Sequence, residues 1–326
     1  MEPTSTLARR FWAAIEPLHS IVYFAPEPIE AMRAIGLRGF WMGYFASRVA
    51  PMGNVPAAAV GAMAYGFAPH LVARAIPDAW KFATPAAILD ARLASAGDAL
   101  RRHLKGSPKG GALDALDALD ALDALDALDA LDALDALDAL DALDALDALD
   151  ALDALDALLW QAIDGCRFDG RALAAAWSSV PRPEDRFQSV WLAATVLREH
   201  RGDGHVLAAV ANGLRGLDAT LTHVATGAIP RALVQPTRGW SDDDWEQSVR
   251  RLQARGLLDR DGRLTKTGGA LRRDVEDQTD RLAAGPVERL GSTGVERATG
   301  LAAPLSRHLM DAGIVPLPNP VGSPRP

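Results

Sequence analysis

The chain has 326 residues, of which 49% are hydrophobic and 23% are charged, and this composition excludes global disorder. Its 34 Lys and Arg residues against 42 Asp and Glu residues give a formal net charge of −8, and its single cysteine, Cys166, excludes an intrachain disulfide. Residues 112–156 are fifteen uninterrupted Ala-Leu-Asp copies, which carry 15 of the acidic groups and no basic group. Outside them, 34 basic and 27 acidic side chains leave a net charge of +7, so the acidity does not argue against a nucleic-acid partner.

The first predicted unit is an N-terminal helical half, residues 1–105. Helical patterns dominate it, and strand-like runs between turn residues are almost absent. The segment 37–49 is dense in aromatic residues, and helical spacing places Phe40 and Tyr44 on one face. We expect this aromatic group to lie in the core, and its functional alternative is the wall of an apolar pocket.

A linker, residues 106–158, is predicted to join this half to a second one. Ala and Leu favour helix, so a helix is the expected local state of the Ala-Leu-Asp copies. Three residues advance about 300° around an α-helix, so successive leucines visit every face and form no stable apolar stripe. We interpret the tract as an expanded repeat inserted between two folded halves, and the alternative is a self-association spacer.

The second helical half is predicted to span residues 159–290. A helix is expected over residues 184–200, followed by a tight turn at Arg201-Gly202-Asp203-Gly204 and by another helix from His205. Residues 291–326 are expected to form a C-terminal tail, because the end of this segment is rich in proline.

Residues 230–284 carry the most specific pattern in the chain. Ser241 is a good N-cap for a helix over residues 242–255, whose first turn holds three aspartates that the helix dipole favours. A compact hairpin is expected over residues 257–265 and a long helix over residues 266–284. Helix, helix, short hairpin, helix is the order of a winged helix. The predicted fold class is therefore mainly α, with two helical halves, a winged helix-turn-helix module and a low-complexity helical repeat between the halves.

The residues of this module also resemble MarR-type regulators. The matching residues are Leu252-x-x-Arg255-Gly256-Leu257-Leu258, Asp261-Gly262-Arg263 and Leu264-Thr265-x-x-Gly268-x-x-Leu271. The resemblance covers about a sixth of the chain and implies a winged helix that binds DNA. One departure is that the helix ahead of Asp242 is reduced to a few residues between two prolines.

Nearly the whole chain, apart from the Ala-Leu-Asp tract, resembles an actinobacterial family of helix-turn-helix proteins. The residues that carry this resemblance are Leu37-Arg38-Gly39-Phe40-Trp41, Gly43-Tyr44-Phe45-Ala46 and Leu197-Arg198-Glu199-His200-Arg201-Gly202-Asp203-Gly204-His205. The resemblance implies a helical architecture that contains a winged helix, and it implies little about activity.

In a DNA-binding winged helix, the helix before the hairpin enters the major groove and the wing meets the backbone. The predicted DNA-binding residues are Arg250, Arg251 and Arg255 near the end of that helix, and Arg260 and Arg263 on the wing. Three aspartates at the start of the same helix would repel phosphate. A solvated face of arginines is therefore an equal alternative to DNA contact.

A second candidate site lies around the Gly-rich turn, where two imidazoles, two carboxylates and a guanidinium come close in sequence. Such a set can bind a metal or an anionic ligand, or position a general base. The simpler interpretation is that His200 and Arg201 end one helix while Asp203 caps the next. The ligand or catalytic residues of this alternative are Tyr44, Arg48, Glu199, His200, Arg201, Asp203 and His205.

The leading prediction is a cytoplasmic DNA-binding regulator of MarR-like type. Its expected partners are DNA, a small-molecule effector and a second copy of the chain, with no membrane. The most apolar window, residues 55–76, contains two prolines, a histidine and an arginine, which does not suit a bilayer span. The alternative is a small-molecule-binding protein or a metal-assisted enzyme on winged-helix-like halves, with its site around residues 199–205. The sequence indicates no cofactor and assigns no metal ligands.

Overall fold

The computed structural model describes residues 3–104 and 139–326, with side chains for residues 3–104 and 150–326. The described residues are mainly helical, which confirms the predicted fold class, and the β-bridge that they contain joins Leu258 to Leu264. No helix among them combines the length and apolar character that a membrane crossing needs. Most of the predicted linker, residues 106–138, lies outside the described residues.

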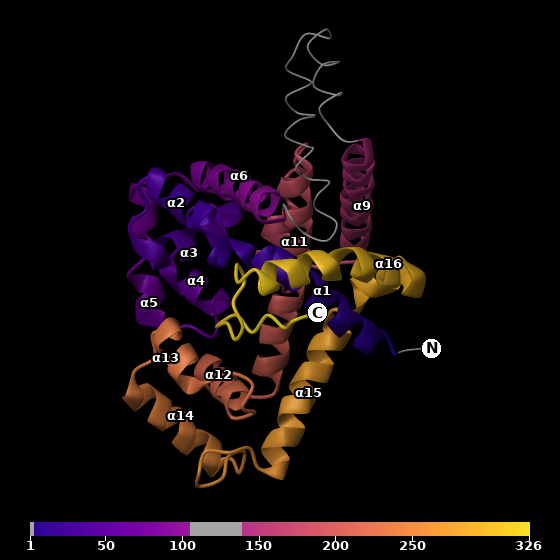
Figure 1. The fold of residues 1–326 in the computed structure, drawn as a ribbon. Helices are drawn as coiled ribbons and strands as arrows, with labels where there is room; N and C mark the ends of the chain where they lie inside the picture. Colours follow the sequence, from indigo (N-terminus) through magenta and orange to yellow (C-terminus); the bar gives the residue numbers. More distant parts are fainter. Residues whose placement is uncertain (1–2, 105–138) are drawn as a thin grey trace.

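Most of the elements before the linker lie on one side of the body in Figure 1, and the first helix crosses to the other side. These elements are α1 (Thr4–Ser20), η1 (Ile21–Tyr23), α2 (Pro26–Ala34), α3 (Gly39–Val49), η2 (Ala50–Met52), α4 (Ala57–Met63), α5 (Pro69–Ala73), η3 (Asp78–Lys81) and α6 (Pro85–Leu104). The elements after it are α9 (Ala139–Ile163), α10 (Ala172–Ser178), α11 (Arg186–Ala211), α12 (Gly216–Val224), α13 (Arg231–Arg238), α14 (Asp242–Ala254), α15 (Lys266–Leu282) and α16 (Ala284–Asp311).

One hydrophobic core joins the elements on both sides of the linker. Its buried residues run from Leu7 to Leu104 and from Leu152 to Val315, and α1 packs along both α16 and α11. Trp177 and Trp191 are completely buried at its centre, with ring centroids 5.6 Å apart in an edge-to-face arrangement. Their indole N–H groups donate to backbone carbonyl oxygens, so these large apolar side chains are buried without an unsatisfied donor.

The end of the Ala-Leu-Asp tract contributes to this core through α9. Leu152, Leu155 and the following Leu159 are buried, and Asp156 accepts hydrogen bonds from Ser189 and Arg182. We expected no apolar stripe along the tract. The leucine position rotates around the helix axis by only about 60° from one copy to the next. Leucines of neighbouring copies therefore still share one face, and the apolar stripe is lost only over a longer stretch.

Two segments after the linker differ from the sequence predictions, residues 201–204 and residues 291–311. The expected turn at residues 201–204 is absent, because α11 continues through it from Arg186 to Ala211. Gly204 instead allows Arg171 and Leu282 to lie close to the backbone of α11, since a Cβ on Gly204 would lie 3.1 Å from Arg171 and 3.3 Å from Leu282. Residues 291–311, expected in a tail, form most of α16 and bury Val295, Ala302 and Leu309 against the body.

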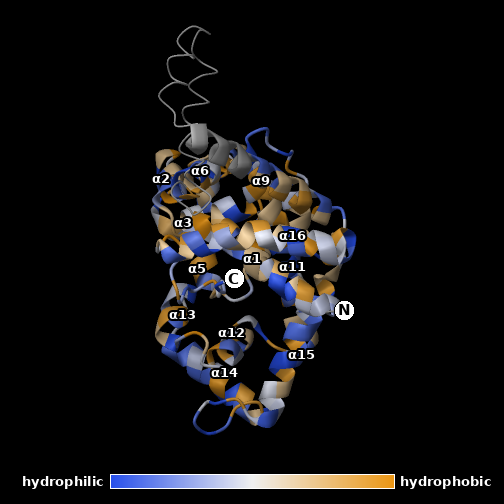
Figure 2. Ribbon diagram, turned by 45° about the vertical axis from the view of Figure 1, so that its right-hand side comes forward, coloured by the Kyte–Doolittle hydropathy of each residue, from blue (hydrophilic) through white to orange (hydrophobic). Residues whose placement is uncertain are grey.

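The four helices α12 to α15, residues 216–282, form an arm that extends from the body, as Figure 1 shows. The arm has a hydrophobic core of its own, which includes Leu217, Trp245, Leu252 and Val275. Figure 2 shows hydrophilic residues along much of α13, α14 and α15. The amphipathic pattern of the predicted module therefore corresponds to helices that bury one face in a small separate core.

Candidate functional site

The first candidate site is the pair of helices α13 and α14 in the arm. Gly239 ends α13 in the left-handed conformation, with φ of 75°, and the side chain of Ser241 caps α14 by accepting from the backbone N–H of Asp244. Three residues thus separate the two helices, a spacing that is typical of a helix-turn-helix. The helix ahead of Asp242, expected to be stunted, runs for eight residues and contains Pro236.

The segment after α14, predicted as the wing, forms a short hairpin-like loop. The bridge between Leu258 and Leu264 is antiparallel, and the N–H of Asp259 donates to the carbonyl oxygen of Arg263 at 2.9 Å. The Asp259 carboxylate accepts from the backbone N–H groups of Asp261 and Arg263, each at 2.9 Å, and so closes the loop tip. The expected hairpin is present in this shortened form.

The five predicted DNA-binding arginines divide into two groups. Arg250, Arg260 and Arg263 are exposed, at the end of α14 and on the wing. Arg251 pairs with the buried Asp218 carboxylate at 2.9 Å. Arg255 is also exposed, but its guanidinium donates to the backbone carbonyl oxygens of Gly213 and Asn212, at 2.7 and 3.1 Å. Arg251 therefore holds α14 against α12, and Arg255 holds it against the end of α11.

The aspartates at the start of α14 have structural partners. Asp242 accepts from Arg231 at 2.7 Å and from Gln235 at 2.9 Å, and the hydrogen bond from Gln235 is the main cause of a lowered pKa of this carboxyl. Asp244 completes the capping box with Ser241. Asp243 and Glu246 are exposed on the same helix, and Glu246 lies 3.6 Å from Arg250. The exposed face of α14 consequently carries both signs of charge.

The loop between α4 and α5 fastens the arm to the body, in addition to the packing of α15 on α11 and α1. Tyr65 donates to the carbonyl oxygen of Leu214, and the N–H of Ala68 donates to that of Arg238 at 2.9 Å. The Arg238 guanidinium lies 4.2 Å from the centre of the Phe67 ring. These contacts fix the last turn of α13 against the N-terminal part of the chain.

The alternative site is assembled only in part. Arg48 donates to both carboxylate oxygens of Glu199, at 2.9 and 2.8 Å, and its Nη1 lies 3.5 Å from the Tyr44 hydroxyl. Arg198 donates to the same carboxylate at 2.9 Å. Burial alone would raise the pKa of Glu199, but the charges of Arg198 and Arg48 outweigh it and hold that pKa well below its usual range. Tyr44, Arg48 and Glu199 therefore meet in a buried ion-pair network.

The other four residues of that prediction point in different directions from α11. His200 accepts from the backbone N–H of Arg167 at 3.3 Å, Arg201 pairs with Asp280 at 2.7 Å, and His205 lies 3.1 Å from the Thr279 hydroxyl. Asp203 caps a helix distant in sequence, α10, by accepting from the N–H groups of Leu173 and Ala174 at 3.1 Å each. Within the described part of the chain, no three His, Cys, Asp or Glu side chains gather closely enough to hold a metal ion.

Burial also determines the titration of the two histidines. It lowers the pKa of His200 to about 4, with a further contribution from the positive charge of Arg171. Burial likewise lowers the pKa of His205 to about 4. Both imidazoles are therefore neutral near pH 7, and they serve packing and hydrogen bonding between helices.

Sequence reasoning missed most members of the buried network around Glu199, which we call the polar cluster. It comprises Glu16, His19, Arg48, Arg92, Arg198 and Glu199. His19 lies 2.9 Å from the Thr195 hydroxyl and 3.0 Å from that of Tyr23. One signal was available, because Glu16 and His19 interrupt an otherwise apolar face of α1 at a spacing of three residues.

The two helices and the short turn between them define a helix-turn-helix protein. The comparison with protein families agrees: a model described as "Helix-turn-helix family" matches residues 8–137 and again residues 114–316. The chain belongs to this helix-turn-helix family. The two matches overlap only within the Ala-Leu-Asp tract. No curated protein and no solved structure matches the chain.

Proposed function

We propose that the protein is a DNA-binding regulator of the winged-helix, MarR-like type, which contacts DNA through the arm. The observation that carries the proposal is the three-residue turn between α13 and α14, followed by a wing whose tip is exposed. Membership of the helix-turn-helix family supports it. In this class of fold the second helix of the pair approaches the major groove. A cytoplasmic location belongs to the proposal because DNA is accessible there.

The proposed contacts to DNA are Arg250, Arg260 and Arg263. Arg263 is 79% exposed and Arg250 is 65% exposed, so both can reach phosphate without breaking a buried contact. Arg251 and Arg255, also predicted as contacts, act in this proposal by positioning α14. Contacts from exposed arginines to phosphate give affinity that depends strongly on salt and little on base sequence.

The acidic residues of α14 limit the proposed affinity. The charge of Asp242 is balanced by Arg231, and that of Asp244 lies in the cap, but Asp243 and Glu246 remain exposed on the helix. We therefore expect binding to be driven by the wing rather than by the start of α14. Asp243→Asn should strengthen DNA binding, because it removes a negative charge that would face phosphate.

The experiment compares the binding of a fluorescein-labelled duplex by fluorescence anisotropy at about 50 mM salt, since low salt favours phosphate contacts. The double variant Arg260→Ala with Arg263→Ala should bind about tenfold more weakly or worse. Arg297→Ala, an exposed arginine on α16 outside the arm, is the matched control and should bind like the wild type. Equal affinity of the double variant and the control would refute the proposal that Arg260 and Arg263 contact DNA.

The alternative function, with a ligand or catalytic site around Glu199, has weaker support. The Glu199 side chain is 0% exposed, and both of its oxygens already accept hydrogen bonds from Arg48 and Arg198. A general base needs a free lone pair within reach of its substrate. The geometry around Glu199 instead suits a role in stabilising the body.

A further inference from the structure

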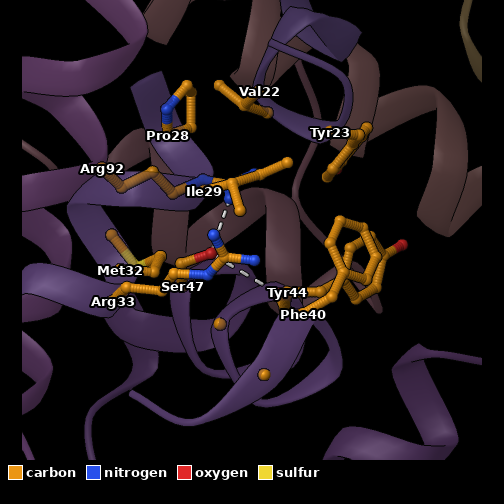
Figure 3. Close-up of a pocket in the computed structure, with 12 residues that line it drawn as sticks. Val22, Tyr23, Pro28, Ile29, Met32, Arg33, Phe40, Tyr44, Ser47 and Arg92 are labelled. Atoms are coloured by element: carbon orange, nitrogen blue, oxygen red, sulfur yellow. Dashed lines mark hydrogen bonds between the residues drawn. The ribbon is translucent and has the colours of Figure 1, made fainter. Parts of the chain in front are cut away.

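A hollow in the body lies between α2 and α3, and Arg92 of α6 contributes to its lining. It is partly open to solvent and is lined by residues of η1, α2, α3 and α6. Arg33, Gly39 and Phe40 are exposed at the mouth, whereas Tyr23 and Arg92 are buried deeper. Figure 3 shows Tyr23, Phe40 and Tyr44 together on one side of the pocket, with Pro28, Met32 and Arg33 on the other. The walls are thus largely apolar or aromatic, which is typical of sites for small organic molecules.

The Arg92 guanidinium is buried beside this pocket and only partly satisfied. The residue is 3% exposed, and its Nη1 donates to the Ser47 hydroxyl at 2.6 Å, as the dashed line in Figure 3 marks. Nε and Nη2 are also buried and have no hydrogen-bond partner. The guanidinium carbon lies 5.6 and 5.3 Å from the ring centres of Tyr23 and Trp191. Cation–π contacts compensate part of its lost hydration, but no acceptor bonds to Nε or Nη2.

The free edge of Arg92 has the geometry that binds a carboxylate. Nε and one Nη of arginine present two parallel N–H groups, which match the two oxygens of a carboxylate. Arg48 demonstrates this use in the same cluster, because its Nε and Nη2 hold the two oxygens of Glu199 at 2.9 and 2.8 Å. In Arg92 the same pair of nitrogens has no partner.

The charges of the polar cluster also leave a cation unmatched. Three guanidinium groups, those of Arg48, Arg92 and Arg198, meet two carboxylates, Glu16 and Glu199. His19 adds no charge near pH 7, because burial and the nearby Arg198 hold its pKa well below its usual value. Both carboxylates are already paired with Arg48 or Arg198. A buried unpaired charge is costly, so an anion beside Arg92 would complete the cluster.

We propose that the pocket between α2 and α3 binds a small apolar carboxylate. Its carboxylate pairs with Nε and Nη2 of Arg92, and its apolar part lies against Tyr23, Phe40 and Tyr44. One buried cation between aromatic walls matches a monoanion better than a phosphate dianion, whose second charge would lack a buried partner. Some lining side chains must shift for the ligand to reach Arg92, and Met32 and Arg33 are the most flexible of them.

The test is isothermal titration of the full chain with benzoate, with its uncharged isostere benzamide and with inorganic phosphate. Benzoate is expected to bind with one-to-one stoichiometry, at least tenfold more tightly than benzamide and than phosphate. Arg92→Met keeps the apolar stem of the side chain and removes the charge and the fork, so it should weaken benzoate binding at least tenfold. Arg297→Met, an exposed arginine on α16, is the matched control and should bind benzoate like the wild type.

A second variant keeps the proposal testable if Arg92→Met fails to fold. Phe40 is 40% exposed at the mouth, so Phe40→Ala should fold normally and weaken benzoate binding severalfold by removing one wall. Benzoate should also raise the melting temperature of the wild type and not that of Arg92→Met. Equal binding of benzoate and benzamide, unchanged binding by Arg92→Met, or no benzoate binding up to millimolar concentration would each overturn the proposal. Tighter binding of phosphate than of benzoate would overturn the choice of ligand class.

Discussion

Glu199→Gln is the substitution that most directly probes the polar cluster. The carboxylate is 0% exposed and accepts hydrogen bonds from Arg48 at 2.9 and 2.8 Å and from Arg198 at 2.9 Å. Glutamine keeps the shape but removes the charge, and its NH₂ group would point a donor at one of the two guanidinium groups. Arg48 would then be left with an uncompensated charge in the interior, and Arg198 would keep only its ion pair with Glu16.

The expected cost follows from the burial of the partners. The side chains of Arg48 and Arg198 are only 12% and 15% exposed, so water replaces little of the lost interaction. Removing one partner of a buried ion pair costs about 3–5 kcal/mol, because the other charge stays buried. We therefore expect Glu199→Gln to lower the free energy of unfolding by about 3–5 kcal/mol. With a urea m-value near 3 kcal/mol/M, the unfolding midpoint should fall by about 1 M or more.

The assay is equilibrium unfolding in urea, followed by tryptophan fluorescence and circular dichroism. Glu296→Gln, an exposed glutamate on α16, is the matched control and should change the stability by less than about 0.5 kcal/mol. If Glu199→Gln behaves like this control, the charges of Arg48 and Arg198 are not balanced by Glu199, and the reasoning about the cluster fails.

Three further predictions concern pH, close packing and the repeat. The pKa of His200 is lowered to about 4 from an unfolded value near 6.5, so only the unfolded chain takes up a proton between these pH values, and stability falls as pH decreases through this window. His200→Gln should reduce that fall by about 3 kcal/mol when urea titrations at pH 7 and pH 4 are compared. An unchanged fall in stability would contradict the lowered pKa of His200. A Cβ at Gly216 would lie 1.7 Å from the carbonyl oxygen of Tyr65, so Gly216→Ala should lower stability by about 1–3 kcal/mol. Gly61 in α4 has free space around it, so Gly61→Ala should raise stability by about 0.5–1 kcal/mol. Melting temperatures of the two variants that shift in the same direction would refute this contrast. Leu155→Ala, in the completely buried part of the repeat, should cost about 2–5 kcal/mol by creating a cavity, and a loss no larger than that of the half-buried Leu158→Ala would show that α9 does not pack as described.

The features that the sequence predicted well are those set by neighbours along the chain. The cap at Ser241, the buried positions Trp245 and Leu252, and the short wing depend on local spacing and on residues with strong turn or cap preferences. The contact between Tyr44 and Arg48 also follows from helical spacing, since the two residues are four apart. Local signals therefore predicted the order and type of the elements in the arm.

The features that the sequence failed to predict depend on distant partners. Gly202 and Gly204 were predicted to form a turn, but α11 is continuous through them, and Gly204 lies close to Arg171 and to Leu282 of α15. Asp203 caps α10, about thirty residues away, rather than a helix that follows it. The pairs that build the polar cluster, such as Arg48 with Glu199, are separated by 151 positions, and one sequence does not show which distant charges meet.

The dependence of DNA affinity on salt tests the central proposal most directly. Kd for a labelled duplex is measured by anisotropy at several salt concentrations for the wild type and for Arg260→Ala with Arg263→Ala. If both wing arginines contact phosphate, the slope of log affinity against log salt should be less steep in the double variant by about 1.8, from about 0.9 per contact. Parallel slopes for the two proteins, or no binding by the wild type at low salt, would contradict DNA recognition by the arm.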